Sequence, residues 1–307
     1  MADGVFRKAR LLRRRRLVSE RLFAALGIVS LTIAVGTFIV LFGDLLVDGL
    51  PRIDWQFLTS FPSRRAAEAG ILPAWVGTTL VMAVAIAVGV PLGVAAGLYL
   101  EEYAGKNWMT DLIEVTVTNL AGVPSIIYGL LALGLFVHML GLGESIAAAG
   151  LTLALLILPV IITSTREAIR AVPREIREAS YAVGATKWQT VARHVLPYAT
   201  PAILTGVILA LSRAIGETAP VITIGALTFI AFLPPAPLTT EPPFISFEWL
   251  RSPFTLMPIQ MFAWVSRPGE DFVSNAAAAG IVLLLMTLTM NSLAIYLRYR
   301  WRKRLAW

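Results

Sequence analysis

Six long apolar stretches constrain this chain more than any other feature of its sequence. They lie at about 22–46, 75–100, 112–140, 146–165, 199–232 and 276–297. A helix needs about 20 apolar residues to cross the roughly 30 Å hydrocarbon core of a bilayer, so each stretch is long enough to span it. With 57% hydrophobic and 15% charged residues, the chain is too apolar for an ordinary soluble domain of 307 residues. The sequence therefore predicts an all-α polytopic membrane protein with six transmembrane helices.

The basic residues orient these spans. If the six stretches cross in turn, 20 of the 26 Lys and Arg residues fall on one side, five fall on the other, and Arg213 lies within a span. Because basic loops stay in the cytoplasm, both termini are predicted to be cytoplasmic. The stretch RLLRRRRL at 10–17 is interpreted as an anchor to anionic lipid rather than a nucleic-acid surface. The apolar run after it is too long for a cleaved signal peptide.

The chain divides most simply into one membrane domain with two basic tails. We expect a cytoplasmic tail at 1–21, the transmembrane domain at 22–297 and a second tail at 298–307. Two segments rich in Pro, Trp and Phe, 48–73 and 233–275, are predicted to lie outside, and 166–198 inside.

The sequence also excludes several kinds of chemistry. There is no cysteine, so disulfides, thiolate metal sites and cysteine nucleophiles are excluded. The two histidines, His138 and His194, have no metal-binding partners at a suitable spacing, so no metal site is expected. The G-x-x-x-x-G-K-[ST] phosphate loop is absent from the sequence, so we do not expect this chain to hydrolyse ATP or to be an enzyme.

The large inside segment carries helix signals. Pro173 can open a helix in its first turn and Gly184 can end one, which predicts two short helices with a bend at Gly184. The first helix would place Ile176, Ser180 and Val183 on one side. A solvated loop that merely joins two spans is the alternative interpretation.

Within this segment, EASYAVGATKWQTVARHVLP resembles the cytoplasmic EAA loop of bacterial ABC importer permeases. That pattern is E-A-A, a glycine after three further residues, and I-x-L-P after nine more. The matching residues are Glu178, Ala179, Gly184, Leu196 and Pro197, while Ser180 replaces the second alanine and His194 stands where isoleucine is usual. The resemblance implies that 178–184 forms a coupling helix that docks into a groove of the ATPase subunit.

Four further stretches resemble the phosphate-specific permeases of the Pst system. They are PLGVAAGLYLEEYA at 91–104, NLAGVPSIIYGL at 119–130, LSRAIGETAP at 211–220 and FTLMPIQMFAWVSRP at 254–268. The last two are similar to the PstA-type rather than the PstC-type subunit. The resemblance implies the fold of a type I ABC importer permease in the inner membrane of a bacterium.

The same resemblance implies a set of partners. The chain would pair with a PstC-type permease and form half of a pathway for inorganic phosphate import. A PstB-type ATPase dimer would bind ATP and Mg and supply the energy, and a PstS-type phosphate-binding protein would deliver the substrate from outside. No cofactor is expected in this chain itself.

Two charged residues in the fifth apolar stretch are the main candidates for the substrate pathway. A charge at the centre of a span costs roughly 2.5–3.5 kcal/mol on insertion scales, so Arg213 and Glu217 need an interior or watery surrounding. Four residues apart, they can pair on one helix face. Their pairing could be a purely structural salt bridge. On the functional interpretation, Arg213 offers a planar fork of donors to phosphate oxygens, and Glu217 holds the guanidinium when the pathway is empty.

Asn119 and Ser125 are further pathway candidates, because they lie where the third stretch is interrupted. Irregular backbone at membrane depth is tolerated where it is buried or lines a cavity. A kink that lets helices pack closely is the alternative. For the whole chain, the rival functions are a permease for another oxyanion, such as molybdate or sulfate, and an ATP-independent anion transporter.

Overall fold

The computed structural model describes residues 2–105, 107–237 and 244–304. Lys106, part of the outer segment 233–275 and the end of the tail 298–307 lie outside the described residues. The regular elements of the described chain are helices. They are α1 (Ala2–Gly49), η1 (Leu50–Arg52), α2 (Trp55–Thr59), η2 (Ala66–Glu68), α3 (Leu72–Leu98), η3 (Tyr99–Tyr103), α4 (Trp108–Leu120), α5 (Ser125–Ala132), η4 (Leu133–Met139), α6 (Ile146–Arg170), α7 (Arg174–Ala182), α8 (Lys187–Thr190), η5 (Val191–Val195), α9 (Leu196–Ala214), α10 (Ala219–Thr223), η6 (Glu248–Arg251), α11 (Met257–Val265) and α12 (Glu270–Arg304).

The long helices confirm the predicted polytopic all-α fold. Five helical runs among the described residues are long and apolar enough to cross a membrane: Glu20–Arg52, Leu72–Tyr103, Ile146–Arg170, Lys187–Ala214 and Glu270–Arg300. A sixth apolar unit combines α4 with α5 and η4, and it is bent by 109° at its break. The third predicted span is therefore two helices at a steep angle.

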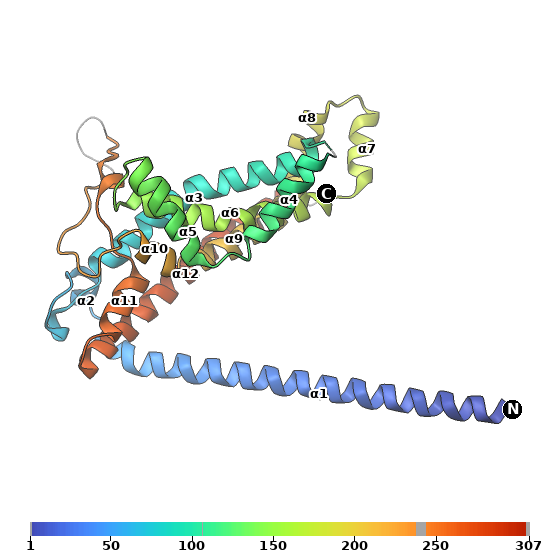
Figure 1. Ribbon diagram of the computed structural model, residues 1–307, viewed down its shortest axis with the longest axis horizontal. Helices are drawn as coiled ribbons and strands as arrows, with labels where there is room; N and C mark the ends of the chain where they lie inside the picture. Colours follow the sequence, from blue (N-terminus) through green and yellow to red (C-terminus); the bar gives the residue numbers. More distant parts are fainter. Residues whose placement is uncertain (1, 106, 238–243, 305–307) are drawn as a thin grey trace.

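The elements sort to the two ends of the molecule along its long axis. Figure 1 shows α7, α8, the start of α1 and the end of α12 toward one end, and α2 and α11 toward the other. The segments predicted to be cytoplasmic thus lie at a common end, and those predicted to be external lie at the opposite end. Which of the two ends faces the cytoplasm stays a prediction from the basic residues.

The fifth span differs from its prediction at 199–232. The helix runs earlier, from Lys187 to Ala214 through α8, η5 and α9, and breaks before the short helix α10. The wide π-helical turn η5 precedes Pro197, whose missing N–H and bulky ring disturb the preceding turn of an ordinary α-helix. Downstream, Pro220 lacks an N–H but fits the first turn of α10, so it favours a new helix there.

The core is built on the close approach of α3 and α6. Gly89, Gly93 and Gly97 form a stripe along α3 that faces α6. A methyl group at Gly93 would come within 2.7 Å of Ile161, so the two backbones approach more closely than any larger residue allows. Small residues at this spacing are typical of helix packing in membranes, where close van der Waals contact supplies much of the attraction.

The first helix stands apart from this core. The most apolar part of α1 contains no buried residue. The last turns of α1 pack on α12, and Figure 1 shows the rest of the helix extending away from the other helices. A helix with apolar side chains on all sides suits the hydrocarbon of a bilayer rather than water.

At the end of the molecule that carries α2 and α11, Arg52 contacts several segments at once. Its guanidinium donates to Asn275 Oδ1 at 2.9 Å and to the carbonyl oxygens of Ala67 and Ala69 at 2.9 Å each. It also lies 5.0 Å from the ring centre of Phe57. One mostly buried cation thereby joins η1, α2, η2 and α12.

Arg52→Ala is expected to lower the free energy of unfolding by about 2 kcal/mol, because it leaves several polar groups without their charged donor. Arg65→Ala is the control, since Arg65 pairs with Glu68 while 80% exposed, and exposed pairs contribute about 0–1 kcal/mol. Thermal and denaturant unfolding of the purified protein in detergent would measure both. Equal effects of the two variants would contradict this role for Arg52.

Candidate functional site

Two interrupted spans meet in the middle of the fold. The helix α5 follows the break in the bent apolar unit of α4, α5 and η4, and it packs on α10, which follows the break after α9. At this contact a methyl group on Gly129 would lie 2.6 Å from the Pro220 carbonyl oxygen and 2.7 Å from Pro220 Cα. The stretches NLAGVPSIIYGL and LSRAIGETAP are therefore in direct contact, although the sequence separates them by about 90 positions.

The pair of Arg213 and Glu217 lies at the second break. Arg213 is in the last turn of α9, and its Nε donates to Glu217 Oε1 at 3.2 Å. The predicted pairing is present, but Glu217 follows the end of the helix instead of sharing a helix face at mid-span. The Arg213 side chain is 48% exposed and that of Glu217 is 18% exposed. The Nη1 and Nη2 groups of Arg213 have no hydrogen-bond partner among the described residues, so they can bind another group.

Asn119 and Ser125 flank the first break. Asn119 lies exposed at the end of α4, and Ser125 is half-buried at the start of α5. Tyr128, a buried residue, stabilises the bend between them, because its hydroxyl donates to the Leu120 carbonyl oxygen at 2.8 Å. Asn119 also lines an open groove of about 520 Å³ with four other residues of α4: Asp111, Glu114, Val115 and Thr118.

The predicted coupling residues occupy a helical hairpin at the opposite end from α2 and α11. Pro173 precedes α7 and Gly184 follows it with a φ of +85°, which a glycine adopts without strain, so both helix signals and the bend are present. Glu178 and Ala179 are exposed on α7. Leu196 packs against the core and Pro197 lies in the first turn of α9. The segment is therefore helical rather than an irregular loop.

Ser180 has a structural reason to differ from alanine. It is buried, and its hydroxyl lies 2.9 Å from Thr190 Oγ1, which fastens α7 to α8. Ile176 packs against the core on the same side as Ser180, but Val183, predicted to share that side, is 84% exposed because it follows the end of α7. With Trp188 it leaves apolar surface at the tip of the hairpin.

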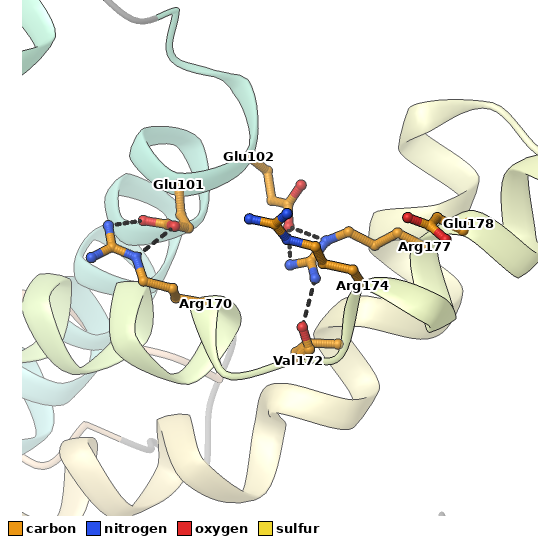
Figure 2. Close-up of a pocket in the computed structure, with 7 residues that line it drawn as sticks. All are labelled: Glu101, Glu102, Arg170, Val172, Arg174, Arg177 and Glu178. Atoms are coloured by element: carbon orange, nitrogen blue, oxygen red, sulfur yellow. Dashed lines mark hydrogen bonds and ion pairs between the residues drawn. The ribbon is translucent and has the colours of Figure 1, made fainter.

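A charged network that sequence reasoning missed joins this hairpin to the spans. Glu101 accepts from Arg170 at 2.9 and 3.0 Å, and Glu102 accepts from Arg177 at 2.8 Å (Figure 2). Arg166, which is buried, reaches Glu114 of α4 at 2.8 Å. Two features of the sequence could have indicated this network. Two adjacent acids stand at the end of an apolar span, and arginines at 166, 170, 174 and 177 recur at a helical spacing.

The whole arrangement matches a known family. The family model described as "Binding-protein-dependent transport system inner membrane component" covers residues 89–305. The chain belongs to this family. It is thus a multi-pass inner-membrane permease component of an ABC transporter and a non-catalytic subunit. Among the described residues, no group of three or more His, Asp or Glu side chains could hold a metal ion.

Several relatives are similar over most of the permease. The probable ABC transporter permease protein YqgI of Bacillus subtilis (strain 168) is 33% identical over 256 residues, covering 83% of this chain and 81% of the relative. The phosphate transport system permease protein PstA of Yersinia pestis is 33% identical over 253 residues, covering 81% and 78%. PstA 1 of Mycobacterium tuberculosis (strain ATCC 25618 / H37Rv) is 34% identical over 230 residues, covering 75% and 70%. The resemblance to PstA-type permeases is confirmed.

A solved structure supports the fold. The permease resembles a chain of a bacterial ABC transporter involved in the import of the acidic polysaccharide alginate, with a TM-score of 0.60, 15% identity and coverage of 93% of this chain and 99% of that chain. At this identity the likeness shows the fold alone. The predicted type I importer permease fold is therefore confirmed.

Proposed function

We propose that this permease forms half of the pathway through which inorganic phosphate enters a bacterial cell, driven by ATP hydrolysis in a partner subunit. The observation that carries the proposal is Arg213, a half-exposed arginine beside the break between α9 and α10. Similarity to phosphate transport system permeases named PstA supports the choice of substrate.

The chemistry of Arg213 suits brief contact with phosphate. Its guanidinium presents several N–H donors in a plane that matches two phosphate oxygens. Conduction requires that the anion leave as well as enter, so the site must not bind too tightly. Glu217 competes for the same guanidinium at 3.2 Å and therefore returns Arg213 to its resting position after each passage. Asn119 and Ser125 provide neutral polar groups along the bend of α4 and α5.

The proposed assembly contains four kinds of subunit. A PstC-type permease completes the pathway facing Arg213, and a PstS-type protein delivers phosphate to the outer segments. A PstB-type ATPase dimer binds ATP and Mg and receives the hairpin of α7 and α8. Glu178, Ala179, Ser180 and Gly184 shape that contact, and Leu196 and Pro197 connect it to α9. Closure of the ATPase dimer would then change the side of the membrane to which the pathway is open.

The first test is uptake of labelled phosphate at low external concentration in cells that lack the gene. The wild-type gene is expected to restore uptake, and excess unlabelled molybdate or sulfate is expected to leave it unchanged. Uptake should also disappear when the ATPase partner is removed. Strong competition by molybdate or sulfate would favour a permease for another oxyanion, and uptake without the ATPase would favour an ATP-independent transporter.

A further inference from the structure

Two adjacent acids at the end of α3 contact different helices. Glu101 and Glu102 lie in the π-helical turn η3, and as neighbours on a helix their side chains point in different directions. Glu101 accepts two hydrogen bonds from Arg170 at the end of α6. Glu102 accepts from Nη2 and Nε of Arg177 on α7, at 2.8 and 3.3 Å. The turn η3 therefore contacts both the end of α6 and the helix α7 that follows it, as Figure 2 shows.

Arg177 makes this junction rigid. Besides Glu102, it donates to the carbonyl oxygens of Val172 at 2.8 Å and Ile169 at 3.0 Å. Ile169 lies in the last turn of α6 and Val172 in the link that follows it, so Arg177 adds a side-chain donor at the C-terminal end of that helix. The segment 171–173 between α6 and α7 would otherwise be a simple hinge, but Arg177 binds α7 to the ends of both α6 and α3.

Burial distinguishes this pair from an ordinary surface salt bridge. The side chains of Glu102 and Arg177 are 9% and 20% exposed, whereas those of Arg65 and Glu68 on the outer side are 80% and 57% exposed. Removing one partner of a largely buried pair leaves the other charge poorly compensated, so such a pair is costly to break. Exposed pairs exchange readily with water.

A third contact reinforces the same connection. The Lys187 ammonium of α8 lies 5.1 Å from the ring centre of Tyr103, the last residue of η3. A cation over an aromatic face is attracted by the ring. The turn η3 thus contacts α6, α7 and α8 through different side chains.

We propose that the Glu102–Arg177 pair is the joint that carries movement of the α7–α8 hairpin to the end of α3. The two are positioning residues: they make α7, the end of α6 and η3 move as one body. This inference rests on the proposed function, because it takes the hairpin as the contact with the ATPase. The new element of the inference is the route of the movement: the hairpin displaces the end of α3, and α3 packs along α6 through its glycine stripe.

The first experiment measures the joint directly and does not depend on the substrate. The chain has no cysteine, so spin labels can be placed through Tyr99→Cys on η3 and Ala182→Cys on α7, both exposed. In the complex assembled with its ATPase, electron spin resonance gives the distance between the labels with and without ATP. The wild-type pair is expected to keep one narrow distance in both states. With Glu102→Gln added, the distribution is expected to broaden or shift when ATP binds.

The second experiment measures coupling in proteoliposomes. Glu102→Gln and Arg177→Gln are expected to retain basal ATP hydrolysis but to transport about fivefold less phosphate per ATP, within the usual range for coupling between sites. The double variant is expected to lose little more than either single variant, because the two residues act together. Glu68→Gln, which breaks the exposed pair, is the control and is expected to change nothing.

A cross-link separates a joint from a general loss of stability. Glu102→Cys combined with Arg177→Cys is expected to be uncoupled, and a short cross-linker between the two thiols is expected to restore transport per ATP. Each single cysteine variant, treated in the same way, should stay uncoupled. The proposal is overturned if cross-linked complexes remain uncoupled or if Glu102→Gln leaves the spin-label distances unchanged. If the wild-type complex transports no phosphate, the proposed function is wrong. The spin-label distances still test whether the Glu102–Arg177 pair holds α7 and η3 together.

Discussion

Replacing Arg213 with Gln is expected to lower the rate of phosphate uptake by about tenfold or more, while the amount of permease in the membrane stays unchanged. Glutamine remains polar, but it loses the charge and the fork of donors. Hydrogen bonds to charged groups contribute about 1.5–3 kcal/mol, and each 1.4 kcal/mol corresponds to about tenfold in an equilibrium constant. Labelled uptake at low external phosphate, normalised to permease in the membrane, measures the effect.

Two further variants sharpen this test. Arg213→Lys keeps the charge but not the planar fork, so its uptake is expected to lie between those of wild type and Arg213→Gln. Arg251→Gln removes an exposed arginine of η6 and is expected to behave as wild type. Uptake at the wild-type rate by Arg213→Gln would make the bond to Glu217 purely structural. Loss of the variant from the membrane would favour the same structural role.

The apolar stretches predicted the number of membrane-spanning elements and their helical form, because the bilayer requires a helix of a certain length from each chain segment that crosses it. A backbone polar group in hydrocarbon must be satisfied within its own segment, so a long apolar run has few alternatives to helix. The starts and ends of helices were less determined. Mostly apolar residues continue from Ile215 to Phe232, and hydropathy alone cannot show that the chain leaves the helix at Ala214. The break follows from Gly216 and Pro220, residues that spans also tolerate.

The contacts between distant segments lay beyond sequence reasoning. Pro173 and Gly184 predicted the bounds of α7 because proline and glycine act on the local backbone. The partner of Arg177 could not be named, because Glu102 lies 75 positions earlier and the pairing depends on how α3 packs on α6. Likewise, the sequence did not show that α5, which follows the bend at 121–124, packs on α10. That contact depends on Gly129, which allows the close approach in the folded protein.

A second large effect is expected from a single methyl group at Gly129. Gly129→Ala would place a carbon 2.6 Å from the Pro220 carbonyl oxygen and 2.7 Å from Pro220 Cα. These are backbone atoms of α10, so they can move only if the whole short helix moves. Overpacking of this kind costs about 1–3 kcal/mol. Displacing α10 would also disturb the break that holds Glu217, so uptake is expected to fall about tenfold.

Gly134→Ala provides a matched control in the same apolar unit. A methyl group at Gly134 meets no atom within 4 Å among the described residues, so it is expected to leave both uptake and thermal stability unchanged. Gly129→Ala is expected to lower both, and Gly129→Val to lower them further, because a branched side chain adds two methyl groups at the same contact. Equal behaviour of Gly129→Ala and Gly134→Ala would mean that α5 and α10 can separate freely. In that case the two interrupted spans would position Arg213 independently of each other, and the packing of α5 on α10 would have no part in transport.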